Sequence, residues 1–232
     1  MLQMLSMGND YPNTSYELVD CALDASRMFV VMQPYLSPQS ELLRNEECKL
    51  TNIVRWLNSI VKVAKPTDAF VVYNSGHGTS DGKKQGIVLN GGIVLWEARI
   101  RELLRPLTPA VLISDSCFAG GLARGNGTQA RYVPLSKLPH QSQWTPTKRM
   151  GPRQYDYFAA CDTGEVADST GDGGAFTNAV LDVLRDATPR TTLKGVYNRI
   201  RKVLPNADHR QTPQFVASDK GFSQRTLGSF MK

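Results

Sequence analysis

The sequence has no long hydrophobic run, and this absence excludes several classes of protein. No stretch approaches the roughly 18 consecutive apolar residues of a membrane-spanning helix. Residues 1–12 have neither the basic start nor the apolar segment of a secretion signal. We therefore expect a cytoplasmic protein without a membrane partner.

Cysteine and histidine are scarce, which limits the metal and disulfide chemistry that the chain could support. The 232 residues contain four cysteines and three histidines, and no Cys-x-x-Cys pair. A chain of this size without a secretion signal is expected to keep its thiols free. Zinc-ligand spacing is also missing. A catalytic cysteine is the hypothesis that remains.

Clustered positive charge is missing as well, although the net charge is +6. The Lys and Arg residues are scattered, and no basic stripe interleaved with aromatic residues is present, so we expect no nucleic-acid partner. Hydrophobic residues make up 41% of the chain and charged residues 21%, which is typical of a globular protein. The length suits one domain over residues 1–232.

Segments with helical periodicity alternate with short runs of strand-forming residues. The helices are expected at 16–32, 47–64, 96–104, about 176–184 and 192–203, and the strands at 69–73, 110–113, 155–160 and 214–217, with a hairpin at 86–95. This alternation predicts an α/β fold with a mostly parallel sheet. In such sheets functional groups gather beyond the carboxyl ends of the strands.

His77 and Cys117 each follow one of these predicted strands. A thiol becomes a good nucleophile beside a base, and His is the natural base near pH 7. The main-chain N–H groups of Gly78 and Cys117 could together form an oxyanion hole. On spacing alone, a turn histidine and a small buried cysteine explain the same residues, so both interpretations stay open.

The two motifs Ser75-Gly-His-Gly78 and Asp115-Ser-Cys117 resemble the histidine and cysteine motifs of the caspase/metacaspase family of clan CD peptidases. Flanking similarities extend the resemblance over about residues 6–217: Gly8-Asn-Asp-Tyr-Pro12, the segment 18–25, Gly174-Ala-Phe-Thr177 and Gln211-Thr-Pro-Gln214. The residues after the cysteine, Phe118 and Ala119, depart from the common His-Ser and look like those of bacterial members.

The resemblance implies the caspase-hemoglobinase α/β/α sandwich. It divides the chain into a large-subunit-like half at about 1–123, a mobile linker at 124–153 and a small-subunit-like half at 154–232. Regulatory domains could flank such a domain in a longer protein. It also implies a cysteine endopeptidase that works through a Cys–His dyad and an acyl-enzyme.

The resemblance implies a pocket for an Arg or Lys side chain, lined by Asp24, Ser75 and Asp115. Asp115 lies two residues before Cys117, so along a strand it points to the same side. Asp24 borders the apolar stripe of its predicted helix. Taken alone, they could be a helix-surface and a turn-capping aspartate. The expected partners are protein or peptide substrates with basic residues.

Two other functions stay open at this stage. One is a non-catalytic caspase-like scaffold, although such a protein need not keep both dyad residues. The other is a Cys–His hydrolase of another acyl substrate, against which the two carboxylates argue.

No metal and no cofactor are expected. Many metacaspases bind calcium with a cluster of aspartates, and calcium wants six to eight oxygen ligands. In this chain the first acidic residue after Cys117 is Asp156. The loop after His77 offers Asp81 alone before Glu97, followed by Lys83 and Lys84.

The segment 118–153 is rich in Gly and Pro and lacks periodicity, so it is either a functional loop or a disordered linker. Its basic residues are Arg124, Arg131, Lys137, Lys148, Arg149 and Arg153. A peptidase specific for basic residues could cut itself there. A merely mobile loop explains the same composition.

Overall fold

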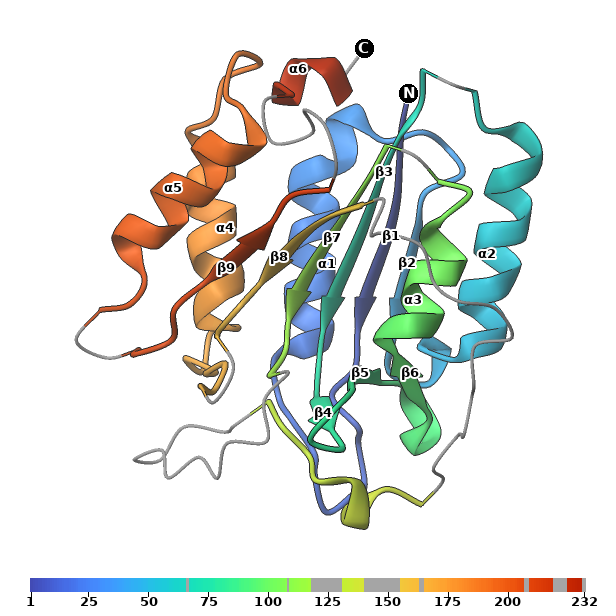
Figure 1. The fold of residues 1–232 in the computed structure, drawn as a ribbon, viewed down its shortest axis with the longest axis vertical. Coiled ribbons are helices and arrows are strands. Elements are labelled where there is room, and N and C mark those ends of the chain that lie inside the picture. Colours follow the sequence, from blue (N-terminus) through green and yellow to red (C-terminus); the bar gives the residue numbers. More distant parts are fainter. Residues whose placement is uncertain are drawn as a thin grey trace.

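A computed structural model of the 232-residue chain gives the architecture. It describes residues 1–65, 67–107, 109–117, 131–139, 155–162, 165–206, 209–218 and 225–230. A six-stranded sheet runs through the centre of the molecule, with helices on both faces (Figure 1). The mostly parallel α/β sandwich that the sequence predicts is therefore confirmed.

The strand order in the central sheet is β2-β1-β3-β7-β8-β9. Five strands are parallel, and only β9 pairs antiparallel to its neighbour β8. The strand bounds are β1 Leu2–Gly8, β2 Glu41–Arg44, β3 Ala69–Ser75, β7 Ala110–Asp115, β8 Tyr155–Ala159 and β9 Gln214–Val216. The sequence predicted four of these strands. The end of β1 is expected only from the family resemblance at Gly8-Asn-Asp-Tyr-Pro12, and no sequence pattern predicts β2, a four-residue strand at the edge of the sheet.

The helices divide between the two faces of the sheet. Two core clusters show the division, because alternate residues of β1 enter different clusters: Leu2 and Met4 pack with α1, α4 and α5, whereas Leu5 and Met7 pack with α2 and α3. The bounds are α1 Cys21–Met32, α2 Leu50–Val63, α3 Glu97–Leu104, α4 Ala175–Arg185, α5 Leu193–Val203 and the short α6 Leu227–Phe230. None of these helices is long and apolar enough to cross a membrane.

The predicted helix 16–32 begins too early, since α1 begins at Cys21. The Asp10 carboxylate accepts hydrogen bonds from the N–H groups of Cys21 and Ala22, at 2.7 and 3.2 Å. This cap comes from outside the helix and fixes where it starts. Residues 13–20 are thereby free to form a loop beside the carboxyl end of β3.

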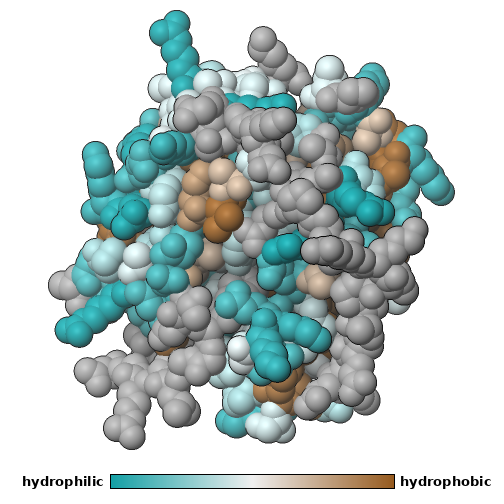
Figure 2. Space-filling model, in the orientation of Figure 1, coloured by the Kyte–Doolittle hydropathy of each residue, from teal (hydrophilic) through white to brown (hydrophobic). Residues whose placement is uncertain are grey.

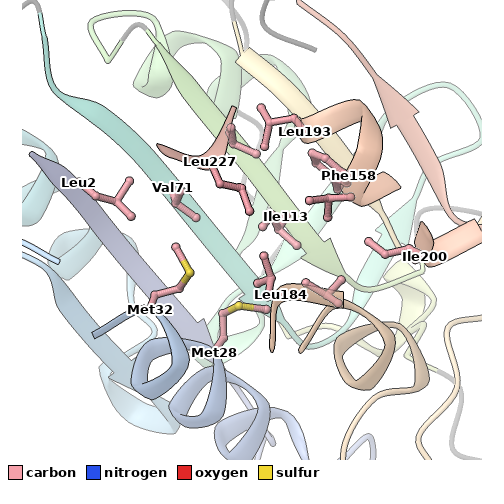
Figure 3. A pocket seen from close by; sticks show the side chains of 13 residues that line it. Leu2, Met28, Met32, Val71, Ile113, Phe158, Leu184, Leu193, Ile200 and Leu227 are labelled. Atoms are coloured by element: carbon pink, nitrogen blue, oxygen red, sulfur yellow. The ribbon is translucent and has the colours of Figure 1, made fainter. Parts of the chain in front are cut away.

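Two features of the packing stand out away from the strand ends. An apolar cavity lies between the sheet and helices α1, α4 and α5, and Met28, Ile113 and Leu184 are among its lining residues (Figure 3). Where the face in Figure 2 is coloured, it is largely hydrophilic, with a few separate hydrophobic patches. Small exposed apolar patches are ordinary in globular proteins.

A second, three-stranded sheet lies at the carboxyl ends of β1, β3 and β7. Its antiparallel strands are β4 Gly78–Ser80, β5 Gln85–Val88 and β6 Val94–Trp96, with a single turn of 3-10 helix at Asn90–Gly92. The predicted hairpin at 86–95 corresponds to β5 and β6. The described segment 131–139 passes beside β4 at this end of the molecule (Figure 1).

Candidate active site

His77 and Cys117 lie just beyond the carboxyl ends of two neighbouring strands. The last residues of β3 and β7, Ser75 and Asp115, are register partners. A Cβ atom on Gly78 would lie 1.6 Å from the carbonyl oxygen of Cys117. Only glycine therefore lets the histidine segment lie directly against the cysteine segment.

The ring of His77 is buried and oriented by two loop tyrosines. Its Nε2 lies 2.7 Å from the carbonyl oxygen of Tyr16. The ring of Tyr11 packs against the imidazole at a centroid distance of 4.9 Å and a tilt of 33°, and its hydroxyl accepts a hydrogen bond of 2.8 Å from the main-chain N–H of His77. A carbonyl can only accept, so Nε2 carries the proton in this arrangement. The Nδ1 atom is buried and has no hydrogen-bond partner.

Burial lowers the pKa of His77 from its usual 6.5 to about 4, although the carbonyls of Tyr16 and Arg131 act in the opposite direction. The imidazole is therefore neutral at pH 7. A neutral ring whose Nε2 is held by a carbonyl leaves Nδ1 as the atom that can accept a proton.

The thiol of Cys117 is fully buried, and its Sγ accepts a hydrogen bond of 2.9 Å from the main-chain N–H of Ala167. Such a donor can solvate negative charge on the sulfur. The Cys161 thiol lies next to it. Its hydrogen bond with Cys117, followed by burial, raises the pKa of Cys161 well above its usual range. No sequence motif assigns Cys161 or Ala167 a role at the site.

Two main-chain N–H groups converge on one carbonyl oxygen at this point. The N–H groups of Gly78 and Cys117 donate to the carbonyl oxygen of Arg131, at 2.9 and 3.1 Å. This is the geometry that the hypothesis of an oxyanion hole requires. In this structure the carbonyl oxygen of Arg131, from the same chain, occupies the position between the two N–H groups.

The side chain of the same arginine enters a buried pocket that contains Asp24, Ser75 and Asp115. Arg131 Nη2 lies 2.8 Å from Asp24 Oδ2, while its Nη1 lies 2.5 Å from Ser75 Oγ and 3.3 Å from Asp115 Oδ2. All four residues are fully buried. The structure thus brings the three predicted pocket residues together around one guanidinium group.

The two carboxylates are held in place by further donors. Ser75 Oγ donates to Asp24 Oδ2 at 2.9 Å, and the N–H of Gly174 donates to both Asp24 oxygens. The N–H and Oγ1 of Thr177 donate to Asp115 Oδ2, at 3.0 and 2.5 Å. These contacts fix the direction in which each carboxylate faces the pocket.

Gly174 also forms part of the pocket wall, at the start of α4. A Cβ on this residue would lie 2.1 Å from Asp115 Oδ2 and 2.8 Å from Arg131 Cζ. Any side chain here would occupy the guanidinium position. The sequence motif Gly174-Ala-Phe-Thr177 contains two residues of the pocket, Gly174 and Thr177. No spacing rule in the sequence connects this motif to Asp115.

The charges in the pocket depend on one another. Burial raises the pKa of Asp24 to about 6, and Arg131 counteracts that rise. Burial alone would lower the pKa of Arg131, but Asp115, Cys21 and Asp24 raise it well above its usual range. Carboxylates buried this deeply need a cation, so the pocket suits a basic side chain.

The one carboxylate in the loop after His77 accepts hydrogen bonds from the main chain of the turn in which it lies. Asp81 Oδ1 accepts hydrogen bonds from the N–H groups of Lys83 and Lys84. Among the residues that the structure describes, no three His, Cys, Asp or Glu side chains are grouped so that they could hold a metal ion.

Only part of the predicted linker can be assessed. Arg124, Lys148, Arg149 and Arg153 lie outside the described residues, whereas Arg131 and Lys137 lie inside them. Lys137 is exposed, but Arg131 is fully buried in the pocket. In the sequence Arg131 is one of six basic residues of the predicted linker, and nothing in the local pattern distinguishes it from the other five.

Comparisons with known proteins identify the family of the chain. The sequence model described as "Caspase domain" matches residues 5–221. Metacaspase-2 of Trypanosoma brucei brucei is 24% identical over 258 residues, covering 94% of this chain and 73% of the relative. Metacaspase-4 of Arabidopsis thaliana is 30% identical over 137 residues, covering 50% of this chain and 33% of the relative.

Solved structures share the same fold. A protein from Geobacter sulfurreducens has a TM-score of 0.77 at 18% identity and covers 97% of this chain and 98% of its own. The Drosophila initiator caspase Dronc has a TM-score of 0.65 at 15% identity, with 99% and 82% covered. At these identities the likeness concerns the arrangement of helices and strands.

Proposed function

Because this chain belongs to the caspase-domain family of cysteine peptidases, we propose that it is an endopeptidase that cuts polypeptides after arginine or lysine. One observation carries the proposal. A single arginine has its guanidinium between Asp24 and Asp115 and its carbonyl oxygen against the N–H groups of Gly78 and Cys117. Side-chain recognition and carbonyl activation thus meet on the same residue.

The reaction would begin with attack of Cys117 Sγ on the carbonyl carbon of the residue in the pocket. His77 Nδ1 accepts the thiol proton. This nitrogen is buried and has no hydrogen-bond partner, so it is available as a proton acceptor. The N–H groups of Gly78 and Cys117 stabilise the negative charge that develops on the carbonyl oxygen. His77 then gives the proton to the leaving amine, and a thioester remains on Cys117 until water hydrolyses it.

Arginine should be the better of the two basic residues. Its planar guanidinium places two nitrogens toward Asp24 and Ser75 at once, as Arg131 does. A lysine ammonium can reach one carboxylate well and the other only weakly. The proposed partners are therefore protein or peptide substrates with an exposed arginine or lysine.

A panel of fluorogenic peptides that differ only in the residue before the cleaved bond tests the proposal. Arg and Lys peptides should be hydrolysed, and Asp and Leu peptides should not. Cys117→Ala and His77→Ala should each lower kcat/KM by roughly 10³-fold or more, and the double variant should be no worse, because the two residues act as a unit.

Cys48→Ala is the matched control, since Cys48 is another buried free thiol away from the pocket. It should leave peptide hydrolysis unchanged. A non-catalytic scaffold would cut none of the peptides, and a hydrolase of other acyl groups would cut simple esters but not arginine peptides. Either pattern would rule out the proposed function.

A further inference from the structure

Two buried hydroxyl groups, the Tyr73–Thr177 pair, extend the hydrogen bonds of the pocket into the core. Thr177 Oγ1 lies 2.5 Å from Asp115 Oδ2, and Tyr73 Oη lies 2.5 Å from Thr177 Oγ1. Tyr73 belongs to β3 and Thr177 to the first turn of α4. Both are fully buried, as is Asp115, so the pair joins the pocket to the interior between the sheet and α4.

The protons in this chain of hydrogen bonds run in one direction. The Asp115 carboxylate can only accept, so the single proton of the Thr177 hydroxyl points at Asp115 Oδ2. Tyr73 must then donate to Thr177 Oγ1. Burial raises the pKa of Tyr73 well above its usual range, and Asp24 and Asp115 act in the same direction, so Tyr73 keeps the proton that it donates. Each donor polarises the next, which strengthens the hydrogen bond to the carboxylate.

Among the described residues, the hydrogen-bond donors to the Asp115 side chain all reach the same oxygen. Oδ2 accepts from the N–H and the hydroxyl of Thr177, and Arg131 Nη1 lies 3.3 Å from it. Oδ1 is buried and has no partner in that part of the chain. The terminal torsion of an aspartate is broad, so the donors on Oδ2 determine how the carboxylate is turned.

We propose that Tyr73 and Thr177 are positioning residues that make the pocket prefer arginine to lysine. The proposal rests on the proposed function and names the side chains that set its order of preference. Asp24 lies 2.8 Å from one guanidinium nitrogen of Arg131, and Asp115 lies 3.3 Å from the other. A lysine ammonium has one nitrogen, which Asp24 can hold alone. The additional affinity for a guanidinium therefore depends on Asp115, whose orientation depends on the pair.

The other carboxylate of the pocket is held by different groups. Asp24 accepts hydrogen bonds from Ser75 Oγ and from the N–H of Gly174, and in the described part of the chain neither of these donates to Asp115. Loss of the Tyr73–Thr177 pair should therefore disturb Asp115 and leave Asp24 in place. Arginine and lysine peptides then report on different parts of the pocket.

The test compares kcat/KM for an arginine peptide with kcat/KM for the matching lysine peptide in each protein. Both peptides meet the same amount of folded enzyme, the same Cys117 and the same Arg131 in the pocket, so these factors cancel in the ratio. Thr177→Val removes the hydroxyl and keeps the shape of the side chain. It should lower kcat/KM roughly tenfold for the arginine peptide and by about twofold at most for the lysine peptide. Most of the loss should appear in KM, because the pair acts on binding rather than on the reacting bond.

Tyr73→Phe should lower the arginine-to-lysine ratio in the same direction but by only about two- to threefold, because Thr177 still donates to Asp115 without a polarising donor behind it. In the Thr177→Val background, Tyr73→Phe should change the ratio no further, since Tyr73 acts only through Thr177. The double variant also removes the unpaired Tyr73 hydroxyl that Thr177→Val leaves in the core. It should therefore fold at least as stably as Thr177→Val, and it carries the test if that single variant does not fold.

Two further variants are controls. Thr177→Ser keeps the hydroxyl and should keep the wild-type arginine-to-lysine ratio. Tyr197→Phe removes the hydroxyl of a tyrosine in α5, which donates to the carbonyl oxygen of Pro213 at 3.3 Å. It should leave the hydrolysis of both peptides unchanged, so a fall in the ratio is specific to the Tyr73–Thr177 pair.

The outcomes separate the two proposals. An unchanged ratio in Thr177→Val, or equal losses for the two peptides, would overturn the role of the pair in selecting arginine and leave the proposed function standing. A further fall in the ratio when Tyr73→Phe is added to Thr177→Val would show that Tyr73 does not act through Thr177. If the wild-type protein cuts neither peptide, the proposed function itself is wrong, and the role of the pair is wrong with it.

Discussion

At the scale of single residues, the pocket is a set of buried charges that stabilise one another. Asp24, Asp115 and Arg131 are all fully buried, and each would be costly to bury alone. The net contribution of such a group of charges to the free energy of folding is modest, but loss of one partner leaves an uncompensated buried charge. The same balance that holds Arg131 in place would select a basic side chain from an external substrate.

The first prediction concerns these carboxylates. Asp24→Asn or Asp115→Asn should reduce kcat/KM for an arginine peptide because each substitution leaves the guanidinium with one buried carboxylate. The expected loss is roughly 2–5 kcal/mol, or about 30-fold to several thousand-fold. It is measured with the fluorogenic arginine peptide.

Asp172→Asn provides the comparison, since Asp172 is exposed in the loop before α4 and contacts Arg27 through its main-chain oxygen. Its kcat/KM should match wild type. Pocket variants that cut arginine peptides as well as this control would show that Asp24 and Asp115 do not recognise the substrate.

The second prediction uses the lowered pKa of His77. An unfolded chain protonates this histidine near pH 6.5, whereas the folded chain protonates it only near 4. The unfolded state therefore binds more protons between these values, so stability falls as pH falls from 6.5 toward 4. Between pH 7 and pH 4.5 this effect amounts to about 2–3 kcal/mol.

Urea unfolding of Cys117→Ala, with and without His77→Gln, measures the effect. The protein that retains His77 should lose more stability on acidification than the His77→Gln protein, by the amount given above. Parallel pH dependences for the two proteins would mean that the folded state does not hold the imidazole neutral.

At the scale of elements, the candidate active site lies at the carboxyl ends of β3 and β7. Both strands continue two residues beyond their predicted ends, to Ser75 and Asp115. These residues therefore belong to the sheet and pair in register. That rigid pairing explains how a serine and an aspartate from distant segments face one guanidinium.

The third prediction concerns the loop between β4 and β5, where Asp81 is the sole acidic residue. Its carboxylate caps the turn through Lys83 and Lys84 and is exposed. One carboxylate among positive charges is a poor calcium ligand set. Peptide hydrolysis in excess EDTA should thus be close to that in millimolar calcium. A calcium requirement that Asp81→Ala abolishes would contradict this expectation.

At the scale of the whole molecule, the two predicted halves of the chain share one sheet. Strand β7 belongs to the first half and β8 to the second, and they pair in parallel from Ala110 and Tyr155 to Ser114 and Ala159. Helices from both halves also meet, because Arg27 of α1 donates to Asn178 of α4 at 2.8 Å. None of these contacts involves the predicted linker, so we expect them to survive a cut there.

The fourth prediction follows from this shared sheet. If residues 122–127 are replaced by the recognition site of a sequence-specific protease and the chain is cut there, the fragments should migrate as one particle in gel filtration. They should separate only in denaturant, because the β7–β8 pairing is buried. The uncut protein is the reference for elution volume. Separation under native conditions would show that the covalent connection is needed to hold the halves together.

Much of this molecule could be predicted from local sequence patterns. Apolar runs such as 69–73 and 110–113 predict buried parallel strands, and strand ends in such sheets collect functional groups. His77 and Cys117 could therefore be placed at neighbouring strand ends. Each of these inferences depends on residues near one another in the chain.

The tertiary structure alone decided what fills the pocket and which side chains complete it. Arg131 lies 107 positions from Asp24 in the sequence, and Gly174 lies 150 positions away. The start of α1 was likewise set by Asp10 rather than by the helix itself. Periodicity reports only which face of an element is apolar, whereas a buried ion pair forms where distant segments meet, so its partners emerge only once the chain has folded.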